Sequence, residues 1–121
     1  MLPGVDGGRG GGALKPEGYD RVAREQLGNA MDALEGPGPI KKRLYRAWLR
    51  GLHVVITERL SDRVRQEFEQ IEEALTWVPP GPEEADEDEG SVIATLKVMS
   101  EAEALALAAR IEALYDSFDP P

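Results

Sequence analysis

The residues best suited to chemistry in this chain are its one histidine and a group of cations close to it. His53 is the only histidine. A catalytic histidine needs a nucleophile to serve and a group that orients its ring, yet Thr57, not a carboxylate, stands four residues later. The chain has no cysteine, which excludes disulfides, thiolate catalysis and cysteine-ligated metal sites. We therefore predict a protein that is not an enzyme and that uses neither a cofactor nor a metal ion.

The cations form a stripe at helical spacing. Lys42, Arg46 and Arg50 recur every four residues, and Lys41 and Arg43 stand beside them. Such a stripe can hold phosphate groups and would make binding sensitive to salt. It can equally be a solvated face, or contact an acidic partner. The formal net charge of −9 argues against nucleic acid as the main partner.

An acidic run follows further along the chain, between Glu83 and Glu89. A calcium loop of the EF-hand type needs acids at alternating positions before its glycine. Counted back from Gly90, the first such position is Ala85, so the pattern does not fit. We predict that residues 79–90 form an acidic, proline-rich loop that stays solvated because its charges repel one another.

These residues must be positioned by helices, and the first begins after a glycine-rich segment. Residues 1–16 bury too little apolar surface to offset their ordering entropy, so we predict a disordered tail before a helical domain over 17–118. Apolar residues at helical spacing predict a first helix from Glu17 or Tyr19 to Leu34. The sequence EGPGP ends it and favours an antiparallel hairpin with the next helix.

The same spacing continues from residue 40 to residue 78 and predicts one long, nearly continuous helix. Ser61 and Asp62 interrupt its pattern, so the helix is either straight or bent near Leu60–Asp62. Residues 92–99 fit both a strand and a helix, and Ser100 with Glu103 predicts a capping box that starts the last helix. The fold class is therefore all-α, a small helical bundle with one long central helix.

An ordered body of roughly 90 residues has only a modest core, which favours association with copies of itself. No apolar run reaches the length of a membrane span, and we expect a cytoplasmic protein with no membrane partner. Trp77, beside the proline break, is a further residue that could anchor a partner. We predict that the protein-interaction surface combines the apolar face of the long helix with the end of the last helix: Trp48, Leu52, Leu60, Val64, Phe68, Tyr115 and Phe118.

In the order of its segments, the chain resembles the core of the actinobacterial proteasome activator family, whose members form rings and need no ATP. The resemblance rests on LSDRVRQEFEQI, on ALTW, on the acidic loop and on SEAEALALAARIEALYDSF. It implies a divergent ring-forming adaptor that captures unfolded or partner proteins. Two departures stand out: Ser61 and Asp62 replace a proline of the family, and SFDPP stands where the family has its Gly-Gln-Tyr-Leu docking tail.

The sequence thus favours a non-enzymatic, protein-binding, oligomerising helical adaptor. One alternative is a nucleic-acid-associated regulator, such as a small antitoxin or phage packaging factor, that uses Lys41 to Arg50. Another is a structural or phage-assembly dimer in which Val92–Met99 pairs with its symmetry mate. An enzyme would have to depend on His53.

Overall fold

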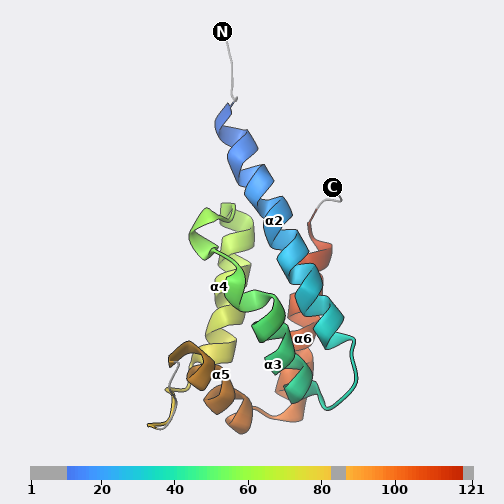
Figure 1. The fold of residues 1–121 in the computed structure, drawn as a ribbon, viewed down its shortest axis with the longest axis vertical. Coiled ribbons are helices and arrows are strands. Elements are labelled where there is room, and N and C mark those ends of the chain that lie inside the picture. Colours follow the sequence, from blue (N-terminus) through green and yellow to red (C-terminus); the bar gives the residue numbers. More distant parts are fainter. Residues whose placement is uncertain (1–10, 83–86, 119–121) are drawn as a thin grey trace.

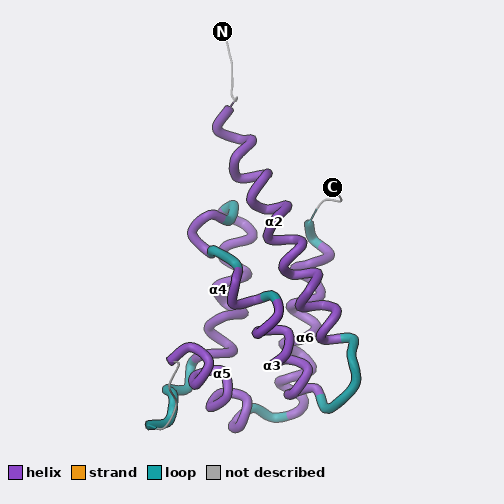
Figure 2. The backbone as a smooth tube through the Cα atoms, viewed as in Figure 1, coloured by secondary structure: helices purple, strands orange, loops and turns teal. Residues whose placement is uncertain are grey.

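The computed structural model describes residues 11–82 and 87–118, and these residues form helices joined by short irregular segments (Figures 1 and 2). No strand occurs among them, so the all-α prediction is confirmed. The described residues contain no helix long and apolar enough to cross a bilayer. The helices are α2 (Gly11–Leu34), α3 (Ile40–Arg50), α4 (Asp62–Thr76), α5 (Glu87–Val98) and α6 (Glu101–Asp116), with the 3₁₀ turns η1 (Leu52–Val54) and η2 (Thr57–Arg59) between α3 and α4.

The first helix ends at Leu34 as predicted but begins earlier, at Gly11. Residues 11–16, predicted as part of the disordered tail, are therefore helical, while residues 1–10 lie outside the described residues. Extending an existing helix fixes only one more residue for each new hydrogen bond, so it costs far less than starting one. The good helix formers Ala13, Leu14 and Lys15 suit such an extension.

Helix α3 returns along α2 as an antiparallel hairpin (Figure 1), as the sequence predicted. The connection turns at Gly38, whose φ of 108° is the one positive φ among the described residues. Glycine adopts this conformation without steric cost. Arg43 and Arg46 of α3 donate hydrogen bonds to carbonyl oxygens of this connection, which holds the hairpin closed.

The prediction of one continuous helix from residue 40 to residue 78 is wrong. Helix α3 stops at Arg50, and the chain reverses so that α4 runs in the opposite direction and packs against α5 and α6 (Figure 1). A Cβ atom at Gly51 would lie 2.2 Å from the Gln26 carbonyl oxygen and 2.9 Å from the Ala30 nitrogen. Gly51 thus brings the α3 backbone against α2, and its φ of −143° takes the chain out of the helix.

The segment between α3 and α4, residues 51–61, is held by polar side chains of α2. The Tyr19 hydroxyl accepts from the Ile56 amide at 2.6 Å, and an Asp20 carboxylate oxygen accepts from the Ser61 amide at 3.2 Å. The Gln26 amide group donates to the Val54 carbonyl at 3.3 Å. The 3₁₀ turns still direct Leu52, Val55 and Leu60 into the core. The apolar spacing therefore persists through a segment that is not an α-helix.

The chain beyond α4 is also helical. Residues 92–99 lie in or directly after α5, and Val92, Leu96 and Met99 are buried on one side at helical spacing, so the strand alternative is wrong. Helix α5 begins at Glu87, which makes the acidic loop shorter than the predicted 79–90; residues 83–86 lie outside the described residues. The predicted capping box of Ser100 and Glu103 is confirmed, with both reciprocal hydrogen bonds present.

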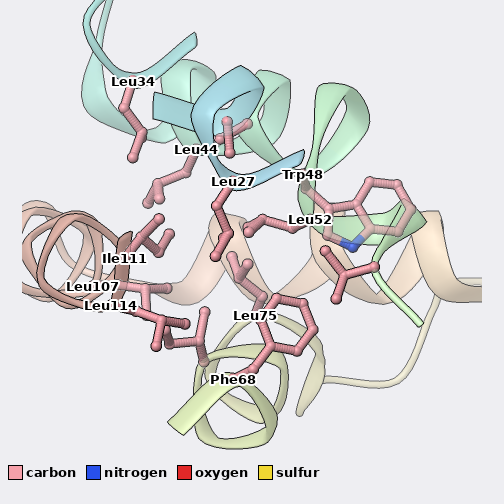
Figure 3. Packing of buried hydrophobic residues seen from close by; sticks show 14 of the residues in the cluster. Leu27, Leu34, Leu44, Trp48, Leu52, Phe68, Leu75, Leu107, Ile111 and Leu114 are labelled. Atoms are coloured by element: carbon pink, nitrogen blue, oxygen red, sulfur yellow. The ribbon is translucent and has the colours of Figure 1, made fainter. Parts of the chain in front are cut away.

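The core fills the space between α2, α3, α4 and α6, as Figure 3 shows. Phe68 of α4, with no exposed surface, reaches the centre of this core, where Leu27 of α2 and Ile111 of α6 also meet. Glu72, on the partly buried side of α4, accepts a hydrogen bond from the Thr57 hydroxyl at 3.3 Å. Burial raises the pKa of Glu72, and the nearby acids Glu69, Asp88 and Glu58 add to the rise, which the Thr57 hydrogen bond only partly offsets.

Gly51→Ala should destabilise the fold strongly, because the added Cβ meets backbone atoms of α2 that cannot move aside. We expect a loss of at least about 2 kcal/mol in the free energy of unfolding, measured by urea denaturation. Gly28→Ala is the matched control, since its Cβ would make ordinary contacts at 3.6 Å with Tyr115. That change should be neutral, or stabilising by up to about 1 kcal/mol. Equal effects of the two substitutions would contradict the close approach.

Glu72→Gln should stabilise the protein at neutral pH and lose this advantage in acid. Because the folded state raises the pKa of Glu72, the protonated carboxyl favours folding below its ordinary value of 4.5, and this contribution is lost as the pH rises through the folded pKa. Glutamine stays neutral and can still accept from Thr57. Unfolding free energies measured across this pH range should therefore converge in acid. Glu73→Gln removes the same charge at an exposed position; as the control, it should change stability by at most about 0.5 kcal/mol.

Candidate protein-interaction site

The residues predicted to bind a partner lie mostly in the core of their own chain, which corrects that prediction. Each of the six most buried is at most 9% exposed: Trp48, Leu52, Leu60, Val64, Phe68 and Phe118. Tyr115 is partly buried, against Gly28 and beneath the Arg24 guanidinium, which stands 5.1 Å from its ring centre. Because the chain folds back after α3, α3 and α4 use their apolar faces to form the bundle itself. These residues therefore do not form an exposed surface.

In the structure, some cations of the predicted basic stripe bond to carbonyl groups of their own chain, and others stay exposed to solvent. The Arg43 guanidinium donates to the Leu34 carbonyl at 2.9 Å and to the Gly38 carbonyl at 2.8 Å. Arg46 donates to the Pro37 carbonyl at 2.8 Å. Both therefore satisfy carbonyl groups at and beyond the end of α2, which carries no basic residue in its own last turn. Lys42 and Arg50 remain exposed.

His53 lies on the surface, where its ring contacts the backbone near the C-terminal end of α3. Its Nδ1 atom is 2.9 Å from the Trp48 carbonyl oxygen, and its ring centre is 5.0 Å from that of Trp48. A carbonyl oxygen only accepts, so Nδ1 carries the proton in this contact. Within the described part of the chain, no group of three or more histidine, aspartate or glutamate side chains could hold a metal ion. The surroundings of His53 thus give it a role in local structure.

A surface hollow of about 420 Å³ opens where the C-terminal ends of α4 and α5 meet α6. Ala74, Met99, Ala106 and Leu107 supply apolar lining. Trp77 stands at this hollow with 65% of its surface exposed, more than any other large apolar side chain among the described residues. Val98 also lines it and is 60% exposed. We call this feature the α4–α6 hollow.

Trp77 is exposed because of where α4 ends. The buried stripe of α4 runs through Phe68, Ile71 and Leu75, and Trp77 falls off it as the C-terminal cap residue. The next residue is fixed, since the Val78 amide donates at 3.1 Å to the hydroxyl of Thr95, which is fully buried in α5. Pro79 and Pro80 then prevent the helix from continuing. The indole is therefore held at the surface by an ordered backbone.

Helix α6, beside the hollow, carries exposed apolar residues on its outer side in addition to its buried inner side. It buries Leu107, Ile111 and Leu114, as expected of one face of a bundle helix. Leu105 is 52% exposed. Glu101 and Glu112 are exposed on the outer side too, and the small residues there let another helix come close. The exposed apolar residues of α6 are Ala102, Leu105, Ala106, Ala109 and Ala113.

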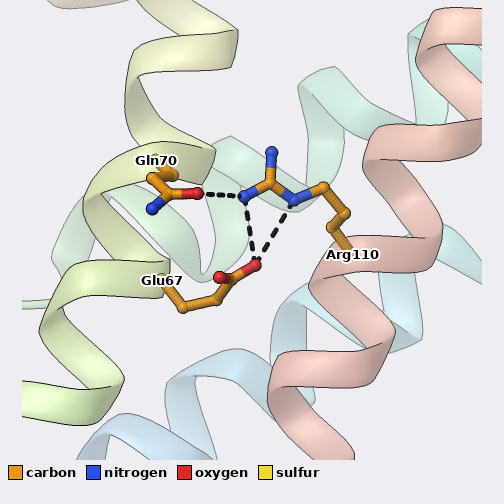
Figure 4. A network of polar contacts seen from close by, with 3 residues as sticks. All are labelled: Glu67, Gln70 and Arg110. Atoms are coloured by element: carbon orange, nitrogen blue, oxygen red, sulfur yellow. Dashed lines mark hydrogen bonds and ion pairs between the residues drawn. The ribbon is translucent and has the colours of Figure 1, made fainter.

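Charges of both signs stand at or beside the hollow: Lys97, next to Val98, is exposed, and Glu103 lies within the field of Lys41 of α3. Arg110 is already engaged: its Nη2 atom lies 3.1 Å from a Glu67 carboxylate oxygen and 2.8 Å from the Gln70 side-chain oxygen (Figure 4). Glu103 lines the hollow, and its hydrogen bonds with the Ser100 amide and hydroxyl lower its pKa, so it is ionised at neutral pH. Glu73, one turn before Trp77, and Glu101, at the start of α6, are exposed.

Some signals of this site were present in the sequence. Trp77 beside a proline break was identified as a candidate anchor, and its exposure is now observed. The alternation of alanine and leucine across both sides of α6 was a second signal. The hollow itself could not be found that way, because it depends on the angles at which the three successive helices α4, α5 and α6 pack. Comparison with family models, with curated protein sequences and with solved structures found no match to this chain.

Replacing Arg43 should test the division of the basic stripe. Arg43→Ala leaves the Leu34 and Gly38 carbonyl groups without their charged donor, and we expect a loss of about 1–3 kcal/mol in unfolding free energy. Lys42→Ala removes the same charge from an exposed neighbour and should change stability by at most about 0.5 kcal/mol. Urea denaturation of both variants compares them directly. Equal losses would mean that Arg43 does not hold the hairpin.

Proposed function

We propose that this chain is a non-enzymatic helical protein-binding module whose binding site is the α4–α6 hollow. The observation that carries the proposal is Trp77, exposed by 65% at an apolar hollow and held there by an ordered backbone. Tryptophan is the residue type most enriched among those that dominate binding energy at protein interfaces. A rigid aromatic side chain also loses little conformational entropy when it is covered. Trp77 is thus the anchor of the proposed site.

The shape of the surface supports a helical partner. The outer side of α6 presents alanine at positions 102, 106, 109 and 113, which allows the backbone of a second helix to approach closely. Val98 extends the apolar area at the edge of the hollow, and Leu105 adds an exposed apolar side chain on the other side of α6. Together these features suit the apolar face of an amphipathic helix, one of the common modes of peptide recognition.

The charge of the surface supports a basic partner. Glu73, Glu101 and Glu103 carry carboxylates around the apolar residues and outnumber the nearby cations Lys97 and Lys41, because the charge of Arg110 is opposed by Glu67. Complementary charge around an apolar centre increases the rate of encounter and excludes partners of the wrong sign. The partner class is therefore a helix with an apolar anchor flanked by lysine or arginine.

The alternatives from the sequence gain less support. A nucleic-acid partner would use the basic stripe, but Arg43 and Arg46 already bond carbonyl groups of their own chain. A ring-forming proteasome activator remains a prediction from the resemblance. The long continuous helix that the sequence predicted is absent, because the chain reverses after Arg50.

The proposal is tested by selecting binders from a displayed library of randomised amphipathic helices. The wild-type chain should enrich sequences that carry an apolar residue beside lysine or arginine. Trp77→Ser should weaken the selected peptides by about 30-fold, the equivalent of a 2 kcal/mol anchor. Val22→Ser, which removes an exposed apolar side chain from α2, is the control and should keep full affinity.

Thermal unfolding should give nearly the same midpoint for both variants, because both positions are exposed. Peptides that bind the Trp77→Ser variant as tightly as the wild type would overturn the proposal. Failure to enrich any family of peptides would overturn it too.

A further inference from the structure

A second exposed surface has the properties expected of the partner. On the outer side of α3, Leu49 is 39% exposed, with Lys42 seven residues before it and Arg50 directly after it. Lys42, Leu49 and Arg50 share one side of the helix, because residues separated by seven or eight positions complete two turns. Helix α3 contains no acidic residue. The outer face of α3 therefore presents one apolar side chain flanked by two cations.

From this match, we infer that the partner in the α4–α6 hollow is the outer face of α3 from a second copy of this chain. The inference rests on the proposed function and identifies the partner of the same site. Leu49 of one copy would enter the apolar hollow beside Trp77 of the next copy. Lys42 and Arg50 would then lie close to the acids Glu73 and Glu101.

The two surfaces cannot dock against each other within one chain, although Lys41 of α3 is near enough to Glu103 to act on its charge. Helix α3 packs its opposite side into the core through Ile40, Leu44, Ala47 and Trp48, so its outer face is directed to solvent. The hollow is lined by residues from the end of α4 to α6, and α3 contributes none. Each copy therefore presents two surfaces: the outer face of α3 with Lys42, Leu49 and Arg50, which we call the donor face, and the α4–α6 hollow, which accepts it. Contacts of this kind are head-to-tail, and successive copies form a closed ring or an open chain according to the rotation between them.

A symmetric contact of hollow with hollow is disfavoured by charge. It would bring Glu73, Glu101 and Glu103 of both copies together in a molecule that already carries a net charge of −9. Like charges placed together at an interface disfavour the contact. The head-to-tail contact instead joins the acidic rim of one copy to the basic helix of the next. The charge pattern thus selects the head-to-tail arrangement.

The Asp32 carboxylate competes with the acids of a second copy for the positive charge of Arg50. Asp32 and Asn29 of α2 border a shallow hollow with Arg50, so a carboxylate partly offsets the cation there. Removing this carboxylate with Asp32→Asn should strengthen self-association, because the donor face then becomes more positive.

Mixing two defective variants provides the decisive experiment. The donor variant carries Lys42→Glu and Arg50→Glu, and the acceptor variant carries Trp77→Ser. In sedimentation-velocity runs, the average mass of the wild type should rise with protein concentration and fall with added salt. Each variant alone should stay monomeric at concentrations where the wild type associates. Their equimolar mixture should give a heterodimer and nothing larger, because only one working contact remains.

Two controls separate specific contacts from general charge effects. Arg21→Glu with Arg59→Glu makes the same change in net charge at exposed cations outside α3 and should associate like the wild type. Glu73→Lys with Glu101→Lys reverses the acidic rim and should bind the donor variant, because the charges are again opposite. Glu103 is left unchanged, since it belongs to the cap of α6.

Several outcomes would overturn the inference. A wild type that stays monomeric would do so, and the proposed function would still stand if library peptides bind it through Trp77. A mixture of the two variants that remains monomeric while the wild type forms dimers would indicate a symmetric contact instead. A monomeric wild type that also enriches no peptides would overturn both proposals.

Discussion

The backbone of Gly51 lies directly against the backbone of α2, and this contact determines where the chain turns. A side chain at this position would overlap the Gln26 carbonyl oxygen, so only glycine lets the end of α3 approach so closely. The approach directs the following residues over α2, and α4 then runs opposite to α3 and packs against α5 and α6 (Figure 1). A straight continuation would have left the apolar side of α4 without the core that it now completes. The bundle depends on this reversal.

Helix α2 holds the irregular segment after α3 in one conformation. Tyr19, Asp20 and Gln26 project toward residues 51–61 and bond backbone groups that lack a partner within a helix. An unpaired backbone amide or carbonyl group that is removed from water costs free energy, so these side chains make the non-helical path acceptable. At the other end of the hairpin, Arg43 bonds the Leu34 carbonyl at the end of α2. Thus α2 provides the fixed frame around which the rest of the chain is arranged.

The sequence predicted the features that depend on neighbouring residues. The end of the first helix at Leu34 and the capping box of Ser100 were both correct, because proline, glycine and serine act locally. The break after Arg50 was missed, because the residues around Gly51 do not show that its backbone packs directly against the backbone of α2. The 3₁₀ turns also preserve the apolar spacing, so periodicity alone could not reveal them.

The same limit applies to the interaction surface. Phe68 and Val64 form a stripe that would serve equally well as an internal core or as a seam between subunits. Only the reversal of the chain decides between these roles, and it places the stripe inside. Trp77 was distinguishable because it stands outside the stripe and next to prolines. The donor face of α3 and the α4–α6 hollow become recognisable only when the packing shows which sides of the helices remain uncovered.

The two tryptophans of this chain stand in opposite environments. Trp48 is 8% exposed within the core beside the ring of His53, and Trp77 is 65% exposed at the surface. Indole fluorescence responds to the polarity around the ring, so the two residues emit as separate probes, one of folding and one of surface coverage. A small neutral quencher reaches Trp77 readily and Trp48 only when the bundle opens. The fluorescence of Trp77 should therefore report when another chain covers this part of the surface.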